Sequence, residues 1–248
     1  MSLTYVFTIP LVPSTLQFRA GMGEQRSFIS NRIRRVSGPE IFDCKSQDLV
    51  TSQSRIEKFR DQIDWIPDDD DESEGGKYDP WVCELLHKDF RGKFDIDTAF
   101  LNPKLHLIFA STVCGPSAVA LLKAGKSPIV QAETNMQIWG LQHTTPADIC
   151  ETIIAGRFAL SADESLRENG TTTGINWAAD DELYLKYLTT GLEKRKASVL
   201  NIFRVWDDIF FLERSSASGK SNSGGSVVDA MEALNADVEE DTENSGGE

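Results

Sequence analysis

Four residues in the middle of the chain are of types that bind metal ions or act as nucleophiles, namely Cys83, His87, His106 and His143. Cys83 and His87 are four positions apart, so on a helix their side chains would share one face. Such residues can ligate a tetrahedral zinc ion or form a nucleophile and its base. The sequence holds no second close pair, and the other spacings are irregular. We therefore assign no catalytic residue, metal ligand or cofactor, and keep a metal protein or a Cys/His enzyme around Cys83 and His87 as an alternative.

The segment Gly125-Lys126-Ser127 is similar to the end of a phosphate-binding P-loop. That pattern requires a glycine where the chain has Ala120, and Pro128 stands where the following helix should begin. The phosphate cradle depends on free backbone N–H groups at a helix start, so we do not expect a nucleotide site. The motifs G-x-S-x-G, H-E-x-x-H and G-x-G-x-x-G do not occur in the sequence.

The residues best suited to nucleic acid are Lys194-Arg195-Lys196 and Arg204, with Trp206 close by. Acidic neighbours at positions 193, 207 and 208 weaken the field of these cations. The whole chain of 248 residues carries 25 basic and 39 acidic side chains, a net charge of −14. This balance opposes broad binding to nucleic acid or anionic lipid. We do not expect a nucleic-acid partner, and a nucleic-acid or mobile-element accessory role is a second alternative.

The acidic residues gather in two blocks. Residues 61–80 hold nine acidic residues and one basic residue, and residues 214–248 hold eight and two. Residues 81–213 are closer to balance, with 17 acidic and 13 basic residues. Because like charges repel and stay hydrated, we expect an acidic linker over 61–76 and a disordered acidic tail over 214–248. An apolar repeat in the tail leaves open a short helix that docks on a partner; it comprises Val227, Val228, Met231, Leu234 and Val238.

The first 60 residues hold nine basic and five acidic residues, with a run of arginines from Arg19 to Arg35. We expect a poorly ordered basic arm over 1–60. An arginine-rich leader is also typical of mitochondrial transit peptides, and a small basic patch can serve nuclear import. We do not expect a secretory signal, because no basic region precedes the apolar start and Pro10 and Pro13 interrupt it.

The four cysteines are sparse and lack paired spacing, which favours reduced thiols in an intracellular protein of the cytoplasm or nucleus, with mitochondria left open. No stretch reaches the roughly 18 apolar residues of a membrane span, so we expect no membrane insertion.

From position 77 onward, apolar residues recur at helical spacing. Asp79-Pro80 predicts the start of a helix over 81–90, Asn102-Pro103 that of a second, and residues 117–124 a third that stops at Gly125. Thr145-Pro146 is the strongest start signal, and its helix should run to about Ser161. A loop over 162–179 and a long helical region over 180–213 follow, with a break or kink near Gly191.

Three stretches together resemble a domain-of-unknown-function family that is expanded in mushroom-forming fungi. They are Lys77-Tyr78-Asp79-Pro80; Leu105-His106-Leu107-Ile108-Phe109 with Gly115-Pro116-Ser117-Ala118; and Trp139-Gly140-Leu141 to Thr145-Pro146, leading into Arg157-Phe158-Ala159-Leu160-Ser161. A C-terminal helix that carries Trp206 and ends in an Ile-Phe-Phe segment fits the same pattern. The resemblance covers about residues 77–213 and implies a fungal, intracellular, helical protein, with no implied reaction.

These patterns predict an all-α fold, an irregular bundle of about five to six helices over 77–213. We expect Thr145, Pro146, Arg157, Phe158 and Trp206 to serve the architecture, with Arg157 pairing with an acid such as Asp163 or binding the turn after its helix. Because the sequence shows no coherent catalytic constellation, the leading hypothesis is a non-enzymatic protein-interaction or regulatory module with an unidentified protein partner. Its acidic segments suit a basic partner.

Overall fold

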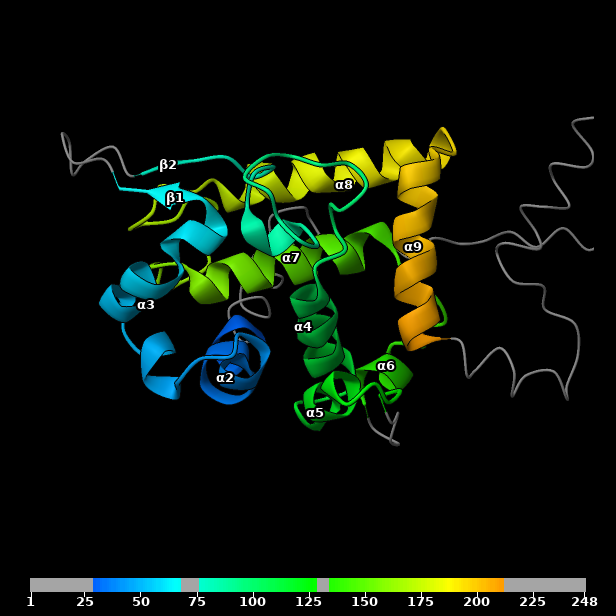
Figure 1. Ribbon diagram of the computed structural model, residues 1–248, viewed down its shortest axis with the longest axis horizontal. Coiled ribbons are helices and arrows are strands. Elements are labelled where there is room, and N and C mark those ends of the chain that lie inside the picture. Colours follow the sequence, from blue (N-terminus) through cyan, green and yellow to red (C-terminus); the bar gives the residue numbers. More distant parts are fainter. Residues whose placement is uncertain (1–28, 68–75, 129–133, 212–248) are drawn as a thin grey trace, which may run out of the picture.

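The structure is a computed structural model that describes residues 29–67, 76–128 and 134–211 (Figure 1). Helices dominate these residues, which confirms the expected all-α class. The helices are α2 (Gly38–Ile41), α3 (Ser52–Phe59), α4 (Pro103–Val113), α5 (Ser117–Lys123), α6 (Asn135–Ile138), α7 (Pro146–Leu160), α8 (Trp177–Glu193) and α9 (Ala197–Phe210). Shorter turns are a π-helical one over Ile33–Ser37 and 3-10 turns over Ser46–Leu49, Arg60–Ile63 and Glu84–Leu86. Strand β1 (Trp65–Ile66) pairs antiparallel with β2 (Lys77–Tyr78).

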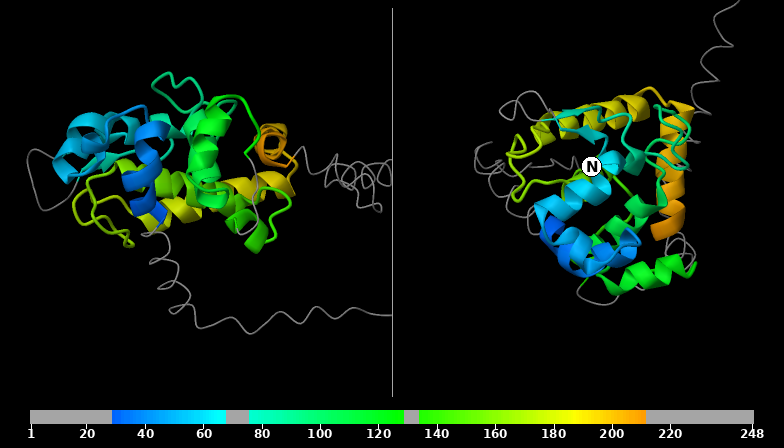
Figure 2. Two further views of the ribbon diagram at one scale, coloured as in Figure 1. Left: turned by 90° about the horizontal axis from the view of Figure 1, so that it is seen from below. Right: turned by 60° about the vertical axis from the view of Figure 1, so that its left-hand side comes forward.

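Helix α7 lies at the centre of this arrangement. Helix α8 runs along it and α4 packs against it, while α9 turns away from the end of α8 (Figure 1). The N-terminal helices α2 and α3 lie at the opposite end of the molecule from α9 (Figure 2). Eleven of the 15 residues of α7 are buried. The helix is therefore covered on most sides, rather than on the single apolar face that its sequence indicates.

Local capping sets the starts of the two central helices as the sequence predicts. At α7, the Thr145 hydroxyl accepts the backbone N–H of Asp148, and an Asp148 carboxylate oxygen accepts the backbone N–H of Thr145. Pro146 occupies the first helical position, where its missing N–H costs no hydrogen bond. At α4, the Asn102 side chain accepts the backbone N–H of Lys104 in the same way. These bonds satisfy N–H groups that have no partner within the helix.

Residues 29–60 are folded, which contradicts the expectation of a poorly ordered arm for this part of the chain. They form helical turns whose apolar side chains Ile33, Ile41 and Phe59 are at most 2% exposed and belong to the same core as α7. The expectation that residues of the arm over 1–60 lie outside the helical domain is therefore wrong for residues 29–60. The basic composition of this segment led to a wrong prediction because not all of its arginines are solvated. Arg34 and Arg55 are buried inside the protein. Residues 1–28 lie outside the described residues.

Arg34 and Arg55 bind the C-terminal end of α7, where backbone carbonyl groups lack helical partners. The Arg34 guanidinium donates to the carbonyl oxygens of Phe158, Ala159, Ser161 and Asp163. Arg55 donates to the carbonyl of Ser161 and pairs with Glu164 at 2.7 Å. These contacts span more than 100 residues of sequence and attach the N-terminal helices to the centre of the fold. They also place positive charge at the negative end of the α7 dipole.

The prediction of an acidic linker over 61–76 is wrong for the residues at its N-terminal end. Ile63 and Trp65 are 1% and 6% exposed, and the Trp65 indole N–H donates to the carbonyl oxygen of Thr173. These residues therefore belong to the fold. The central acidic run, residues 68–75, and the expected tail over 214–248 lie outside the described residues.

Residues 81–90 do not form the predicted helix. The Asp79 carboxylate accepts the backbone N–H of Trp81, which makes a turn, and a short 3-10 turn over Glu84–Leu86 follows. Cys83 and His87 flank that turn in extended conformations. Tertiary packing determines this path, because Leu85 and Leu86 are buried against the core from an irregular segment.

Helices α8 and α9 replace the predicted long helical region. The chain turns at Lys194 to Lys196, where Arg195 has a positive φ of 50°, a few residues after Gly191 (Figure 1). Gly191 instead lies inside α8 against Val199 of α9. A Cβ atom added at position 191 would lie 2.4 Å from a methyl carbon of Val199, so the missing side chain allows the two helices to approach.

Candidate functional site

The structure does not bring the predicted metal and nucleophile candidates together. Within the described residues, no group of three or more His, Cys, Asp or Glu side chains is placed to hold a metal ion. The thiol of Cys83 is fully buried and donates to the carbonyl oxygen of Gln62. Burial raises the pKa of this thiol, which opposes formation of the thiolate that a nucleophile or metal ligand needs.

Both ring nitrogens of His87 have partners that fix the side chain in place. Its Nε2 lies 2.8 Å from the carbonyl oxygen of Trp81, and its Nδ1 lies 3.1 Å from the hydroxyl of Thr98. Because a carbonyl only accepts, Nε2 carries a proton and donates it to the carbonyl oxygen of Trp81. His87 therefore serves as a hydrogen-bonded core residue that holds the loop between Trp81 and Thr98.

His106 and His143 lie in different surroundings. His106 is in α4 and its ring meets the indole of Trp206 edge to face, with centroids 5.0 Å apart. Burial lowers the pKa of His106 from 6.5 to about 4, so the ring is neutral at neutral pH. His143 is exposed on the segment before α7, with Nδ1 3.4 Å from the carbonyl oxygen of Thr144.

Arg157 has an architectural place, with a different partner from the one predicted. Its Nη1 lies 2.6 Å from the Asp180 carboxylate and 3.2 Å from the Tyr184 hydroxyl, which itself donates to the carbonyl oxygen of Pro80. Phe158 beside it is fully buried. The contacts join α7 to α8 and to the segment after β2.

Asp163, the acid predicted to pair with Arg157, is occupied elsewhere. Its carboxylate accepts the backbone N–H groups of Thr172 and Thr173, the Thr173 hydroxyl at 2.6 Å and the indole N–H of Trp177. It therefore organises the loop between α7 and α8.

Trp206 cannot stack on a nucleic-acid base. The residue has an exposed fraction of 0%, and its indole N–H donates to the carbonyl oxygen of Phe100 at 2.9 Å. Lys194 to Lys196 are exposed at the turn between α8 and α9, whereas the Arg204 guanidinium donates to Asn201. The aromatic platform needed for the nucleic-acid alternative is thus missing from this group of residues.

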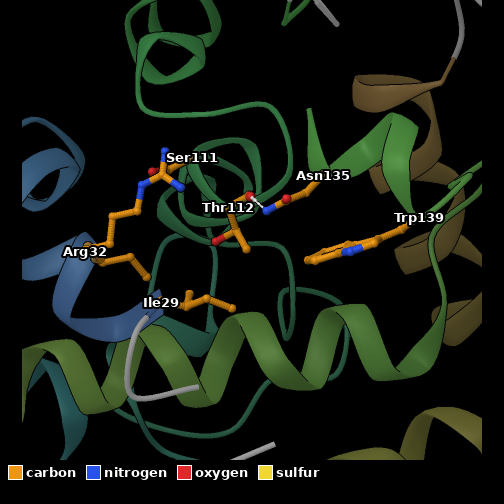
Figure 3. Close-up of a pocket in the computed structure, with 7 residues that line it drawn as sticks. Ile29, Arg32, Ser111, Thr112, Asn135 and Trp139 are labelled. Atoms are coloured by element: carbon orange, nitrogen blue, oxygen red, sulfur yellow. Dashed lines mark hydrogen bonds between the residues drawn. The ribbon is translucent and has the colours of Figure 1, made fainter. Parts of the chain in front are cut away.

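A groove that was not predicted from the sequence lies beside α6. Figure 3 shows Arg32 and Trp139 on opposite sides, with Thr112 and Asn135 between them. We call this the Trp139 groove; its volume is about 240 Å³, and Ile29, Ile33 and Ser111 complete its lining. The Asn135 amide donates to the carbonyl oxygen of Thr112 at 2.9 Å, which anchors the single-turn helix α6 on α4.

Two large apolar side chains that are adjacent in the sequence, Trp139 of the groove and its neighbour Ile138, are exposed. Ile138 is 67% exposed, the highest value among the large hydrophobic side chains of the described residues, and its neighbour Trp139 is 51% exposed. The sequence feature that could have indicated this groove is an Ile-Trp pair followed by Gly140, outside any long apolar repeat. The pair alone does not predict a groove, because the opposite wall consists of Arg32 and Ile29, which are more than 100 residues away in the sequence.

No protein-family model, curated protein or solved structure matches the chain. The resemblance to the fungal family therefore stays a prediction. Among the described residues, no helix combines the length and apolar character required to cross a membrane.

Proposed function

We propose that the protein is a non-enzymatic, intracellular protein-interaction module that docks a partner segment in the Trp139 groove. The adjacent exposure of Ile138 and Trp139 beside this groove carries the proposal, because large apolar side chains together at a surface are typical of interaction sites. The fungal family membership remains part of the proposal.

The size of the groove favours a protein side chain over a small-molecule substrate. A volume of about 240 Å³ falls below the roughly 300–1,000 Å³ typical of ligand pockets. Trp and Arg are the residue types that most often dominate binding energy at protein interfaces. Trp139 and Arg32 face each other here, so one or two partner side chains can contact both.

The lining also determines the chemistry of the partner. The Arg32 guanidinium suits a carboxylate, which it can bind through two parallel hydrogen bonds. Trp139 and Ile29 suit an apolar side chain. The occupant is therefore a segment of another protein that places an apolar residue next to Asp or Glu. This differs from the basic partner that the acidic segments favour, and those segments lie mostly outside the described residues.

The polar groups of the groove support binding rather than catalysis. The Ser111 hydroxyl donates to the hydroxyl of Ser37, and the Thr112 hydroxyl donates to the carbonyl of Ile108. Among the described residues, the side chains that line this groove include no His, Cys, Asp, Glu or Lys. Neither hydroxyl therefore has a general base beside it within the lining, which a nucleophile would require.

Selection from a random peptide display library on the immobilised full chain tests the proposal. We expect enriched peptides that combine an aliphatic or aromatic residue with a neighbouring acid. Trp139→Ala should weaken their binding by about tenfold or more, as expected for a central aromatic contact. Arg32→Gln should weaken acidic peptides and spare analogues in which Asp or Glu is replaced by Asn or Gln.

Val50→Ala is a matched control, because Val50 is 63% exposed and does not line the groove. Circular dichroism checks that each variant stays folded. Selected peptides that bind Trp139→Ala as tightly as the unchanged protein would contradict the proposed surface. Enrichment of basic peptides would contradict the proposed partner chemistry.

A further inference from the structure

A second groove contacts the N-terminal half of α4, whereas the Trp139 groove contacts Ser111 and Thr112 near its C-terminal end. Its volume is about 530 Å³, within the roughly 300–1,000 Å³ of small-molecule sites. We call it the Lys104 groove. The lining residues that matter here are Lys104 and His106 of α4, Leu122 and Lys123 of α5, Asp43 after α2, and Ile209 of α9.

His106 gives this groove an unused polar group. The side chain is 7% exposed, and its Nε2 has no hydrogen-bond partner among the described residues. Buried polar atoms are nearly always hydrogen-bonded, because an unsatisfied one costs free energy. A ligand in the groove can supply the missing partner.

Among the charged side chains that line the groove, one positive charge is not balanced by a paired carboxylate. Lys123 lies 2.6 Å from the Asp43 carboxylate and also donates to the carbonyl oxygen of Glu40, so that pair is neutral. His106 is neutral because burial lowers its pKa to about 4. Lys104 remains, and its ammonium has one long contact, 3.4 Å, to the side-chain oxygen of Gln62. Lys104 also lies in the first turn of α4, where the helix dipole favours an anion.

The rest of the lining is aliphatic except for Asn102, whose side-chain amide is already hydrogen-bonded to backbone groups. Leu122 and Ile209 are partly buried and pack against the core from two different helices. Methylene groups that lie against them leave water, which is favourable in proportion to the apolar area covered. The groove thus offers one cation and an aliphatic wall.

We propose that the Lys104 groove binds a free alkyl monocarboxylate, whose carboxylate pairs with Lys104 and accepts a hydrogen bond from the His106 Nε2–H, and whose chain lies along Leu122 and Ile209. A monoanion matches the single uncompensated charge, whereas a phosphate dianion would exceed it. The site is separate from the Trp139 groove, so the proposal does not depend on the proposed function.

Decanoate, octanoate and decyltrimethylammonium are the probes, titrated into the full chain by calorimetry. We expect decanoate to bind with a dissociation constant of about 0.1 to 1 mM, a normal affinity for a ligand of this size. Octanoate should bind more weakly, by about twofold to fourfold for each methylene removed. Decyltrimethylammonium has the same chain with the opposite charge and should not bind.

Lys104→Gln should weaken decanoate binding by about tenfold, the effect of losing one charge-assisted contact. Lys126→Gln is the matched control, because Lys126 is exposed after α5 and does not line the groove. The control should bind decanoate within about twofold of the unchanged protein.

The three histidines of the chain supply a site-specific readout by NMR. Decanoate should shift the imidazole signals of His106 and leave those of His87 and His143 in place, with the His106 signals assigned from His106→Gln. Equal binding of decanoate and decyltrimethylammonium would overturn the proposal, as would equal effects of Lys104→Gln and Lys126→Gln. Absence of any heat or His106 shift at about 1 mM decanoate would overturn it as well.

Discussion

The guanidinium of Arg157 and the carboxylate of Asp180 form a buried ion pair, with Nη1 2.6 Å from Oδ2. The Arg157 side chain is 0% exposed and that of Asp180 is 5% exposed. Removing charges from water is costly, so such a pair is stable only while both members remain. The pair connects the last turn of α7 to the first turn of α8 and fixes how these two helices meet.

Arg157→Met should lower the free energy of unfolding by about 3–5 kcal/mol, because it leaves Asp180 buried and unpaired. The double variant Arg157→Met/Asp180→Asn removes both charges and should be more stable than Arg157→Met by at least about 1 kcal/mol. Urea denaturation followed by circular dichroism measures both. Lys186→Met, at an exposed position of α8, is the control. A double variant that is no more stable than Arg157→Met would contradict the role of the unpaired Asp180 charge.

Arg34→Met should detach the N-terminal helices from the end of α7, because its guanidinium donates to four carbonyl groups there. We expect amides of residues 33–59 to exchange hydrogen faster while those in the middle of α7 stay protected. Unfolding free energy should fall by about 3 kcal/mol, since buried carbonyls lose their donors. Arg35→Met is the matched control, because Arg35 is exposed. Unchanged exchange over residues 33–59 would show that Arg34 does not hold this segment.

Gly191→Ala should destabilise the protein by about 1–3 kcal/mol, although alanine is the better helix former. The added methyl group would lie 2.4 Å from a methyl carbon of Val199, so α8 and α9 would have to separate. Val199→Ala makes room, so adding Gly191→Ala to that variant should cost much less. Thr189→Ala, at an exposed position of the same helix, controls for helix propensity. Chemical denaturation of the four variants decides the matter, and an equal cost of Gly191→Ala in both backgrounds would rule out the steric explanation.

His106 should make stability fall as the pH drops from 6.5 to 4. In the folded protein burial lowers its pKa from 6.5 to about 4, so the unfolded chain binds the proton first. Its contribution is complete above the unfolded value, declines below it and is lost near pH 4, a total of about 3 kcal/mol. Urea denaturation at successive pH values should show this decline in the unchanged protein and in His143→Gln, but a smaller one in His106→Gln. Parallel curves for all three proteins would refute the assignment to His106.

The starts and ends of helices were predictable where they depend on residues that are close in the sequence. Thr145 and Asp148 satisfy each other's backbone N–H groups within one turn, and Gly125 adopts a positive φ of 69° just after α5. The prediction for 81–90 failed although its spacing of apolar residues is also helical. There, packing of Leu85 and Leu86 from an irregular turn outweighs the local preference.

The candidate sites were largely beyond prediction from the sequence. The Trp139 groove joins residues 29–33 to residues 111–139, and the Lys104 groove joins Asp43 to Ile209. Such surfaces form only when separate helices pack, so no spacing in the sequence encodes them. The predicted cluster of Cys83 and His87 assumed a helix that the structure replaces with a turn.

The sequence by itself determined the helical class and the starts of α4 and α7, because capping and apolar spacing act over a few residues. The tertiary structure decided that residues 29–60 belong to the core and that Arg157 pairs with Asp180 rather than Asp163. A buried charge takes the partner that the packing of distant elements brings within reach and that other donors have not already engaged. Asp163 is held by the backbone of its own loop, so Asp180 was the carboxylate that remained.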